Sequence, residues 1–106
     1  AGALLTLAAP LAAGSIVTAF RVMLADAGRH RSPNAGWPEA AMAGALGVAL
    51  AGPRRYSGII VGDPFMNEGG RRDARPADIW RALRVYLGAN VILFGLVVIA
   101  VALLWR

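Results

Sequence analysis

The apolar and polar positions divide the chain into two uncharged runs separated by a polar middle. Residues 85–105 are twenty-one consecutive positions without a charge. As a helix this run would be roughly 31 Å long, which matches the ~30 Å hydrocarbon core of a bilayer. Arg84 and Arg106 flank the run, and Tyr86 and Trp105 lie near its ends, where membrane helices carry aromatic anchors. We therefore predict a transmembrane helix. The alternative, a buried core helix, needs more surrounding protein than so short a chain supplies.

The first segment, residues 1–24, is also apolar but is interrupted. It carries no charge before Arg21, and Pro10, Gly14 and Ser15 break the run. Broken apolar helices occur in membranes where neighbouring helices satisfy the freed backbone groups. We predict either a kinked membrane helix or a half-inserted helix over this segment.

The middle of the chain, residues 25–84, contains one short predicted helix between two polar loops. Pro38 suits a first helical turn, Glu39 complements the positive end of the helix dipole, and Gly52 stops the helix, so we predict it over 38–51. At roughly 20 Å it is too short to cross a bilayer. Small residues four apart allow neighbouring helices to approach closely. They are Ala43, Gly47 and Ala51, with Ala40 and Gly44 as a parallel row.

These segments together predict an all-α fold class. The chain is expected to be a piece of an integral membrane helical protein, with a short non-spanning small-residue helix and an extended polar loop. Because no methionine opens the sequence, we expect an internal or C-terminal piece of a longer protein.

Composition and charge narrow the partners. The chain is 58% hydrophobic and 16% charged, against about 25% charged in soluble domains. All eleven basic residues are arginine, and seven of them lie between Gly52 and Arg84. Acidic residues are interspersed and no nucleic-acid motif is present, so we exclude nucleic acid as a partner. An arginine-rich loop beside a membrane helix indicates the cytoplasmic side. The absence of cysteine excludes disulfides, thiolate catalysis and cysteine-bound metals.

Candidate chemistry concentrates before the short helix. The run "SPNAG", residues 32–36, predicts a tight turn with Gly36 free to take a positive φ. Asp26 and His30 are four apart, so a helical turn would place them on one face, where they could bind an anion and move protons. Glu39 is equally explained as a simple partner of the helix dipole. One histidine with scattered carboxylates is a poor metal signature, so we predict no metal site from these residues alone. No phosphate-binding glycine loop or nucleophile elbow is present.

A family resemblance extends this interpretation. The segment "DAGRHRSPNAGWPEAAMAGALGVALAGPRRYSG", residues 26–58, resembles the signature of the adenosylcobinamide-phosphate synthase (CobD/CbiB) family of cobalamin biosynthesis. The later "DIWRAL", residues 78–83, is similar to the start of that family's last membrane helix. The likeness covers most of residues 26–104 and corresponds to the last third of family members, which carry further membrane helices upstream. We call residues 26–58 the signature segment.

The resemblance implies a multi-pass enzyme of the bacterial inner membrane with its motif loop in the cytoplasm. That enzyme is a ligase, which forms an amide bond between adenosylcobyric acid and (R)-1-amino-2-propanol phosphate to give adenosylcobinamide phosphate. It implies ATP and Mg²⁺, although the chain has no motif for either. The corrinoid, the aminopropanol phosphate, the lipid bilayer and the missing N-terminal part of the same protein are the implied partners. We expect the chain alone to be inactive.

Site roles follow from the residues that match the family's motif. We assign His30 to proton handling, and Asp26 and Glu39 to the ammonium group or Mg²⁺. The predicted substrate-binding residues comprise phosphate ligands, turn-forming hydrogen-bonding groups and aromatic rings that could stack on the corrin: Arg29, Arg31, Ser32, Asn34, Trp37 and Tyr56.

Two alternatives from another class are non-catalytic membrane proteins. A transporter can also contain short, glycine-rich broken helices, but it has no need of the polar "HRSPNAGWPE" loop. A sensor component distantly related to the synthase is expected to lack the intact "SPNAGWPEAAMAGALG" string. Both rank below the synthase.

Overall fold

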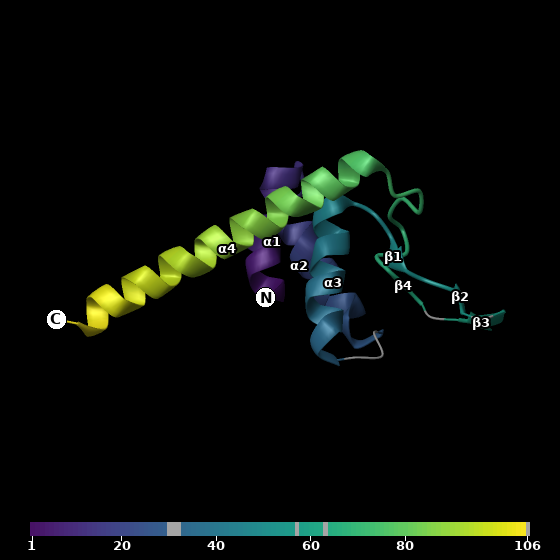
Figure 1. The fold of residues 1–106 in the computed structure, drawn as a ribbon, viewed down its shortest axis with the longest axis horizontal. Coiled ribbons are helices and arrows are strands. Elements are labelled where there is room, and N and C mark those ends of the chain that lie inside the picture. Colours follow the sequence, from purple (N-terminus) through teal and green to yellow (C-terminus); the bar gives the residue numbers. More distant parts are fainter. Residues whose placement is uncertain (30–32, 57, 63, 106) are drawn as a thin grey trace.

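The structure, a computed structural model, describes residues 1–29, 33–56, 58–62 and 64–105. Within these ranges the helical elements are α1 (Gly2–Leu7), the 3₁₀ turn η1 (Ala9–Ala12), α2 (Ile16–Asp26), the 3₁₀ turn η2 (Ala27–Arg29), α3 (Pro33–Leu46) and α4 (Pro76–Leu104). The strands are β1 (Leu50–Ala51), β2 (Arg54–Tyr56), β3 (Ile59–Val61) and β4 (Phe65–Met66). The chain is mostly helical, as predicted, but the strands between α3 and α4 show that all-α was too narrow a class (Figure 1).

The N-terminal apolar segment forms two helices where one kinked or half-inserted helix was predicted over residues 1–24. Pro10 lies in the first turn of η1, and Ala13 after it has a left-handed backbone with φ 58°. Ser15 then caps α2, its side-chain oxygen accepting a hydrogen bond from the Thr18 N–H at 3.3 Å. With 11 residues, α2 is only roughly 16 Å long and cannot cross a bilayer.

The short helix begins and ends earlier than predicted. We expected a turn through Gly36 followed by a helix over 38–51, but α3 runs from Pro33 to Leu46, so Gly36 lies inside it with a helical backbone. Pro33 takes the first-turn position that we had given to Pro38. Gly47, with φ 70°, ends the helix because a left-handed residue stops the helical hydrogen-bond ladder.

The small side chains of α3 let neighbouring elements pack closely against it. A Cβ added at Gly44 would lie 2.8 Å from the Cα of Ala19, so α2 and α3 approach as closely as their backbones allow. Met66 of β4 packs against Ala40 and Ala43 on another face. Ala41 joins the main core, to which α1, α2 and α4 also contribute. The small residues within α3 therefore allow close helix packing, as predicted. Gly47 and Ala51, which were also assigned to this row, lie beyond the end of the helix at Leu46.

Residues 47–71 form an extended β arm that leaves the end of α3 and returns to it (Figure 1). β1 pairs antiparallel with β4, and β2 pairs antiparallel with β3 farther out. At the base, the Ala49 N–H donates to the Arg71 carbonyl at 2.7 Å, and the Arg71 N–H donates to the Gly47 carbonyl at 3.1 Å. These bonds return the chain to α3 before α4 begins.

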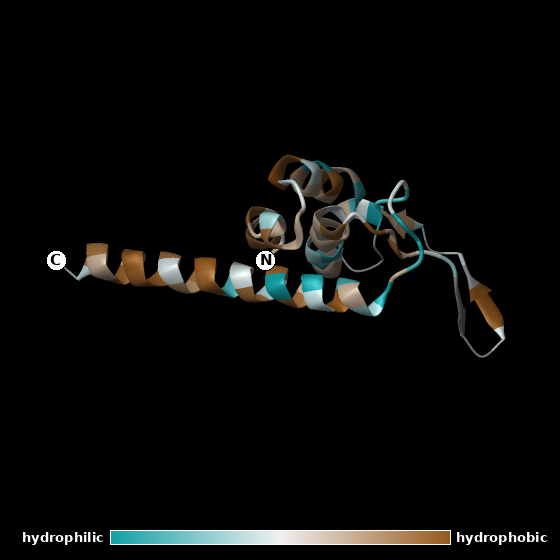
Figure 2. Ribbon diagram, turned by 90° about the horizontal axis from the view of Figure 1, so that it is seen from above, coloured by the Kyte–Doolittle hydropathy of each residue, from teal (hydrophilic) through white to brown (hydrophobic). Residues whose placement is uncertain are grey.

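Helix α4 has a packed first half and a bare second half. It spans 29 residues with a mean hydropathy of 2.7 over its most apolar window, and among the described residues it is the one helix long and apolar enough to cross a membrane. It begins at Pro76, earlier than the predicted 85–105. Its first half packs on η1, α1 and α3, while residues 96–105 are all exposed. The apolar second half projects away from the other helices (Figure 2).

Candidate functional site

The described signature residues lie where α2 ends and α3 begins. Asp26 is the last residue of α2 and Arg29 the last of η2, while Asn34, Trp37 and Glu39 lie in the first two turns of α3. Three predicted site residues fall outside the described residues, and so does the side chain of a fourth: His30, Arg31, Ser32 and Tyr56.

Asp26 is a buried carboxylate with fixed partners. The residue is 8% exposed. Its Oδ2 accepts a hydrogen bond from the backbone N–H of Asn67 at 2.7 Å, and its Oδ1 lies 3.6 Å from Nε of Arg29. A buried carboxylate needs such partners, because an unpaired charge away from water is costly. Asp26 therefore ties the end of α2 to the β arm.

Asn67, which was not among the predicted site residues, connects Asp26 at the start of the signature segment to the end of α3. Its Nδ2 donates to the carbonyls of Ala43 and Val48, both at 3.2 Å, where α3 ends. Its backbone has φ 59°, which asparagine tolerates better than most residues. Gly70 closes the turn, its N–H donating to the Asn67 carbonyl at 2.9 Å. The only local signal is the sequence Asn67-Glu68-Gly69-Gly70, whose asparagine and glycines are typical of a turn.

Two arginines meet at Glu68, next to Asn67. Nη1 of Arg29 lies 4.0 Å from one carboxylate oxygen of Glu68, and Nη2 of Arg72 lies 3.9 Å from the other. Arg72 also stacks over Phe65, with its guanidinium carbon 4.2 Å from the ring centre. We call Arg29, Glu68 and Arg72 the arginine–glutamate edge. It brings a predicted phosphate ligand, Arg29, together with two residues that were not predicted.

A second ionic cluster holds the start of α4. Asp78 Oδ1 accepts hydrogen bonds from Arg71 at 2.7 Å and from Arg81 at 3.0 Å. Arg81 also donates twice to the carbonyl of Ala12, at 2.7 and 3.2 Å, which fixes α4 against η1. Asp78 is the third residue of α4, and its Oδ2 accepts a hydrogen bond from the backbone N–H of Arg75, the residue that precedes the helix, at 2.9 Å. The cluster therefore fixes the start of α4 in place.

Beside that cluster, Asp73 is an exposed carboxylate on the loop before α4. The Arg75 guanidinium donates to Asp73 Oδ2 at 3.0 and 3.2 Å and lowers the pKa of that carboxyl below its usual value. Arg75 is therefore paired away from the arginine–glutamate edge.

An apolar groove runs beside the beginning of α3. It has a volume of about 520 Å³ between α1, α2 and α3, with Asn34 and the half-exposed Trp37 on its wall. Pro38 lies next to Trp37, and since proline has no N–H, the Asn34 carbonyl receives no helical bond from that position. Glu39 is half-buried on the same helix. The groove brings together Asn34 and Trp37, two of the predicted substrate-binding residues.

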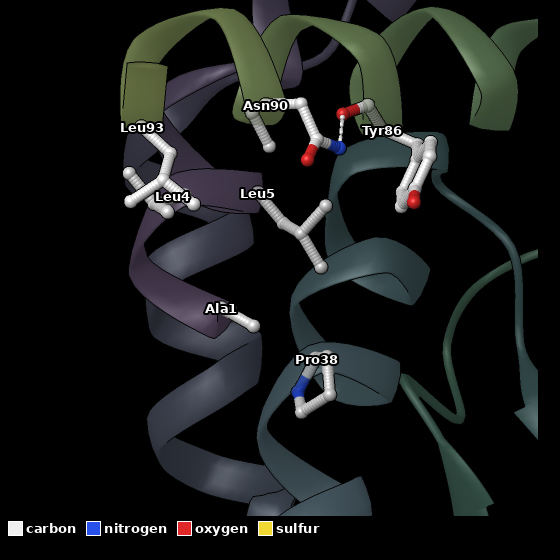
Figure 3. A pocket seen from close by; sticks show the side chains of 8 residues that line it. Ala1, Leu4, Leu5, Pro38, Tyr86, Asn90 and Leu93 are labelled. Atoms are coloured by element: carbon white, nitrogen blue, oxygen red, sulfur yellow. Dashed lines mark hydrogen bonds between the residues drawn. The ribbon is translucent and has the colours of Figure 1, made fainter. Parts of the chain in front are cut away.

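A second cavity of about 370 Å³ lies on the α4 side of Pro38 (Figure 3). Leu4 and Leu5 of α1 face Asn90 and Tyr86 of α4 across it. The Asn90 amide donates to the Tyr86 carbonyl at 2.8 Å. Apart from that amide and the Tyr86 hydroxyl, the lining is apolar, so this cavity offers packing space and little chemistry.

The described residues offer few oxygen ligands to a divalent cation. Among the described residues no group of three His, Asp or Glu side chains could hold a metal ion. Asp26 already accepts from Asn67 and faces Arg29. Mg²⁺ needs several oxygen ligands, so the described residues alone fit it poorly.

The fold and the arginine–glutamate edge define a helical protein with one potential membrane span and a polar, cation-rich face at the start of its central helix. The chain belongs to the CobD/Cbib protein family, whose model matches residues 2–86. The match includes the signature segment and the first third of α4.

Curated relatives agree with the family match. A cobalamin biosynthesis protein CobD of Brucella anthropi is 52% identical over 82 residues, which are 77% of this chain and 25% of that protein. The protein of the same name from Rhizobium meliloti is 52% identical over 88 residues, 82% of this chain and 27% of the relative. One from a Sinorhizobium species is 46% identical over 104 residues, 98% of this chain and 31% of the relative. The chain thus spans between a quarter and a third of the length of these relatives. No solved structure matches it.

Proposed function

We propose that this chain is part of an enzyme of cobalamin biosynthesis that makes adenosylcobinamide phosphate. The observation that carries the proposal is the identity of about half of the aligned residues to proteins named for cobalamin biosynthesis, across the whole signature segment. The reaction is the one that the resemblance implies: an amide bond joins adenosylcobyric acid to (R)-1-amino-2-propanol phosphate.

The chemistry requires an activated acid and a free amine. A carboxylate does not form an amide at neutral pH unless it is first activated, and ATP with Mg²⁺ supplies that activation in the proposed enzyme. Because the described residues fit Mg²⁺ poorly, we derive no step through the metal. Arg29 and Arg31 bind phosphate oxygens, since guanidinium groups pair bidentately with them. His30 takes the proton that the ammonium group must lose before it attacks.

The carboxylates and the rings have distinct proposed roles. Asp26 is buried and already paired, so it orients Arg29 rather than binding the ammonium directly. Glu39, half-buried on α3, receives the ammonium group. Trp37 lines the apolar groove and offers its ring to the corrin macrocycle, with Asn34 beside it for an amide of the corrin. Ser32 and Tyr56 complete the binding set.

The proposed setting is a bacterial inner membrane, with α4 as one of several spans of the full-length protein. The signature segment and the β arm then lie on the cytoplasmic side, where the corrinoid and the aminopropanol phosphate are available.

The test uses the full-length parent gene in a bacterium that lacks the synthase. His30→Ala and Glu39→Gln are expected to leave the amount of protein in the membrane nearly unchanged and to lower cobinamide-phosphate formation at least tenfold, which corresponds to about 1.4 kcal/mol of transition-state stabilisation. Initial rates are measured at saturating corrinoid, with the protein quantified in the same membranes. If the wild-type parent gene does not restore synthesis, the proposal is wrong, and a transporter or sensor role becomes the better one.

A further inference from the structure

The arginine–glutamate edge joins two segments that are distant in the sequence. Arg29 belongs to η2, inside the signature segment, and Arg72 follows the β arm. Their guanidinium groups reach different oxygens of the same carboxylate, that of Glu68. Two cations that converge on one anionic group from separate segments have the arrangement that binds a phosphate.

Both arginines are held by neighbours other than Glu68. The buried carboxylate of Asp26, itself fixed by the Asn67 N–H, lies 3.6 Å from Nε of Arg29. Arg72 rests on the Phe65 ring, and that ring in turn packs on Gly52 so closely that a Cβ there would collide with it. Cations that are fixed in advance lose less conformational freedom when they bind an anion. The two guanidinium groups would thus keep their places if Glu68 moved away.

Glu68 itself is held weakly. Its distances to the two arginines, 4.0 and 3.9 Å, are at the outer limit of an ion pair, and its side chain is 65% exposed. Exposed ion pairs of this kind contribute little to stability, because water screens the charges. A phosphate monoester carries up to two negative charges and forms shorter, bidentate hydrogen bonds with arginine. Such a group would displace the Glu68 carboxylate at little cost.

We infer that Arg29 and Arg72 form a binding site for the phosphate group of a substrate, and that the Glu68 carboxylate occupies this site until the phosphate displaces it. The inference rests on the proposed function and adds Arg72 and Glu68 to its site. The ligand class is a terminal phosphate, carried by the aminopropanol phosphate or by the nucleotide.

The first experiment measures binding without turnover. The full-length parent is purified in detergent, and its thermal denaturation is followed while inorganic phosphate is added. Phosphate is expected to raise the Tm of the wild type. Arg72→Gln, which keeps a side chain of similar length but removes the charge, should abolish that rise. Glu68→Gln removes the competing carboxylate, so half of the rise should occur at a phosphate concentration at least threefold lower.

A matched control comes from the same loop. The side chains of Arg75 and Arg72 are similarly exposed, at 66% and 59%, but Arg75 pairs with Asp73. Arg75→Gln is expected to respond to phosphate like the wild type. If Arg72→Gln also keeps the wild-type response, or if Glu68→Gln weakens it, the inference is wrong. Protection by vesicles that contain phosphatidylglycerol, without protection by inorganic phosphate, would assign the edge to lipid headgroups and overturn the inference as well.

The second experiment identifies the substrate. In membranes with the active full-length parent, Arg72→Gln should raise the KM of one phosphate-bearing substrate at least tenfold, with kcat within about twofold and the KM of the corrinoid unchanged. A rise for aminopropanol phosphate or for ATP supports the inference and names the source of the phosphate. Unchanged KM values for both overturn it. An inactive wild type would instead refute the proposed function, while the phosphate titration still tests the site.

Discussion

At the scale of single residues, Asn67 stabilises the fold in two ways, through its side-chain hydrogen bonds and through its backbone conformation. Its side chain contributes two hydrogen bonds to the carbonyls at the end of α3, and its backbone contributes the N–H that Asp26 accepts. Its φ of 59° is a conformation that glycine adopts freely and that costs an alanine roughly 1–2 kcal/mol. Side-chain bonding and backbone conformation can therefore be tested apart.

We predict that Asn67→Gly and Asn67→Ala both destabilise the full-length protein, and that the alanine variant is the less stable. Each variant loses two side-chain hydrogen bonds, worth about 1 kcal/mol apiece. Only the alanine variant adds the cost of the left-handed backbone, about 1 kcal/mol. Thermal denaturation in detergent should give the Tm order wild type, glycine variant, alanine variant. A wild-type Tm in both variants would show that the amide bonds contribute nothing.

The residue scale also shows where sequence reasoning reached its limit. Asp26 and Arg29 could be selected because they lie in a recognisable segment. Asn67 could not, because its partners lie 41, 24 and 19 positions away and no local pattern encodes such contacts. The same holds for Arg72 and Glu68, which looked like members of an ordinary charged loop.

At the scale of elements, the contact between α2 and α3 depends on a single missing methyl group. A Cβ at Gly44 would lie 2.8 Å from the Cα of Ala19 and 2.9 Å from the Cβ of Val22, distances that real Cβ atoms do not show. Gly95 in α4 is a matched control, because a Cβ there would meet nothing within 4 Å.

Gly44→Ala is therefore expected to force α2 and α3 apart and to lower the amount of folded protein in the membrane severalfold. Overpacking of this kind costs about 1–3 kcal/mol. Gly95→Ala should leave that amount unchanged or raise it slightly, since alanine is the better helix former. Quantitative immunoblots of membrane fractions, with protease resistance as a second readout, measure both. Equal abundance of the two variants would contradict the close packing of α2 against α3.

The position of a helix could be predicted from the sequence where only one assignment satisfied the local sequence rules. The uncharged run 85–105 predicted most of α4 because only a long apolar helix suits it. The start of α3 was wrong because Pro33 and Pro38 both satisfy the rule for a first-turn proline. The rule cannot decide between them, and the helix begins at Pro33. The strands of the arm are two or three residues long, too short for an alternating pattern to be read.

At the scale of the whole molecule, the bare half of α4 and the β arm lie at opposite ends of a body 59 Å long (Figure 1). If α4 crosses the membrane, the arm and the arginine–glutamate edge lie outside the bilayer, on the side that holds most of the arginines. From the positive-inside bias we predict that this side faces the cytoplasm.

Cysteine labelling tests this orientation, because the chain has no cysteine of its own. In the full-length parent, after removal of any cysteines elsewhere, Gly69→Cys should react with a membrane-permeant maleimide in intact cells and with an impermeant one only after the cells are opened. Gly69 has open space for the new side chain. Leu96→Cys, within the bare half of α4, should resist both reagents. Ready labelling of Gly69→Cys by the impermeant reagent in intact cells would reverse the orientation.

The small side chains of α3 also affect the entropy of folding. Alanine and glycine have no side-chain rotamers to lose, so fixing the stretch from Ala40 to Ala45 costs almost none of the side-chain conformational entropy that a leucine-rich helix would lose. Met42 is the one exception in that stretch, and it is only partly buried. Packing against α1, α2, α4 and the β arm can thus immobilise α3 even though little apolar area is buried, because little side-chain entropy has to be offset. Rigidity at this position follows from side chains that have almost no freedom in the unfolded chain.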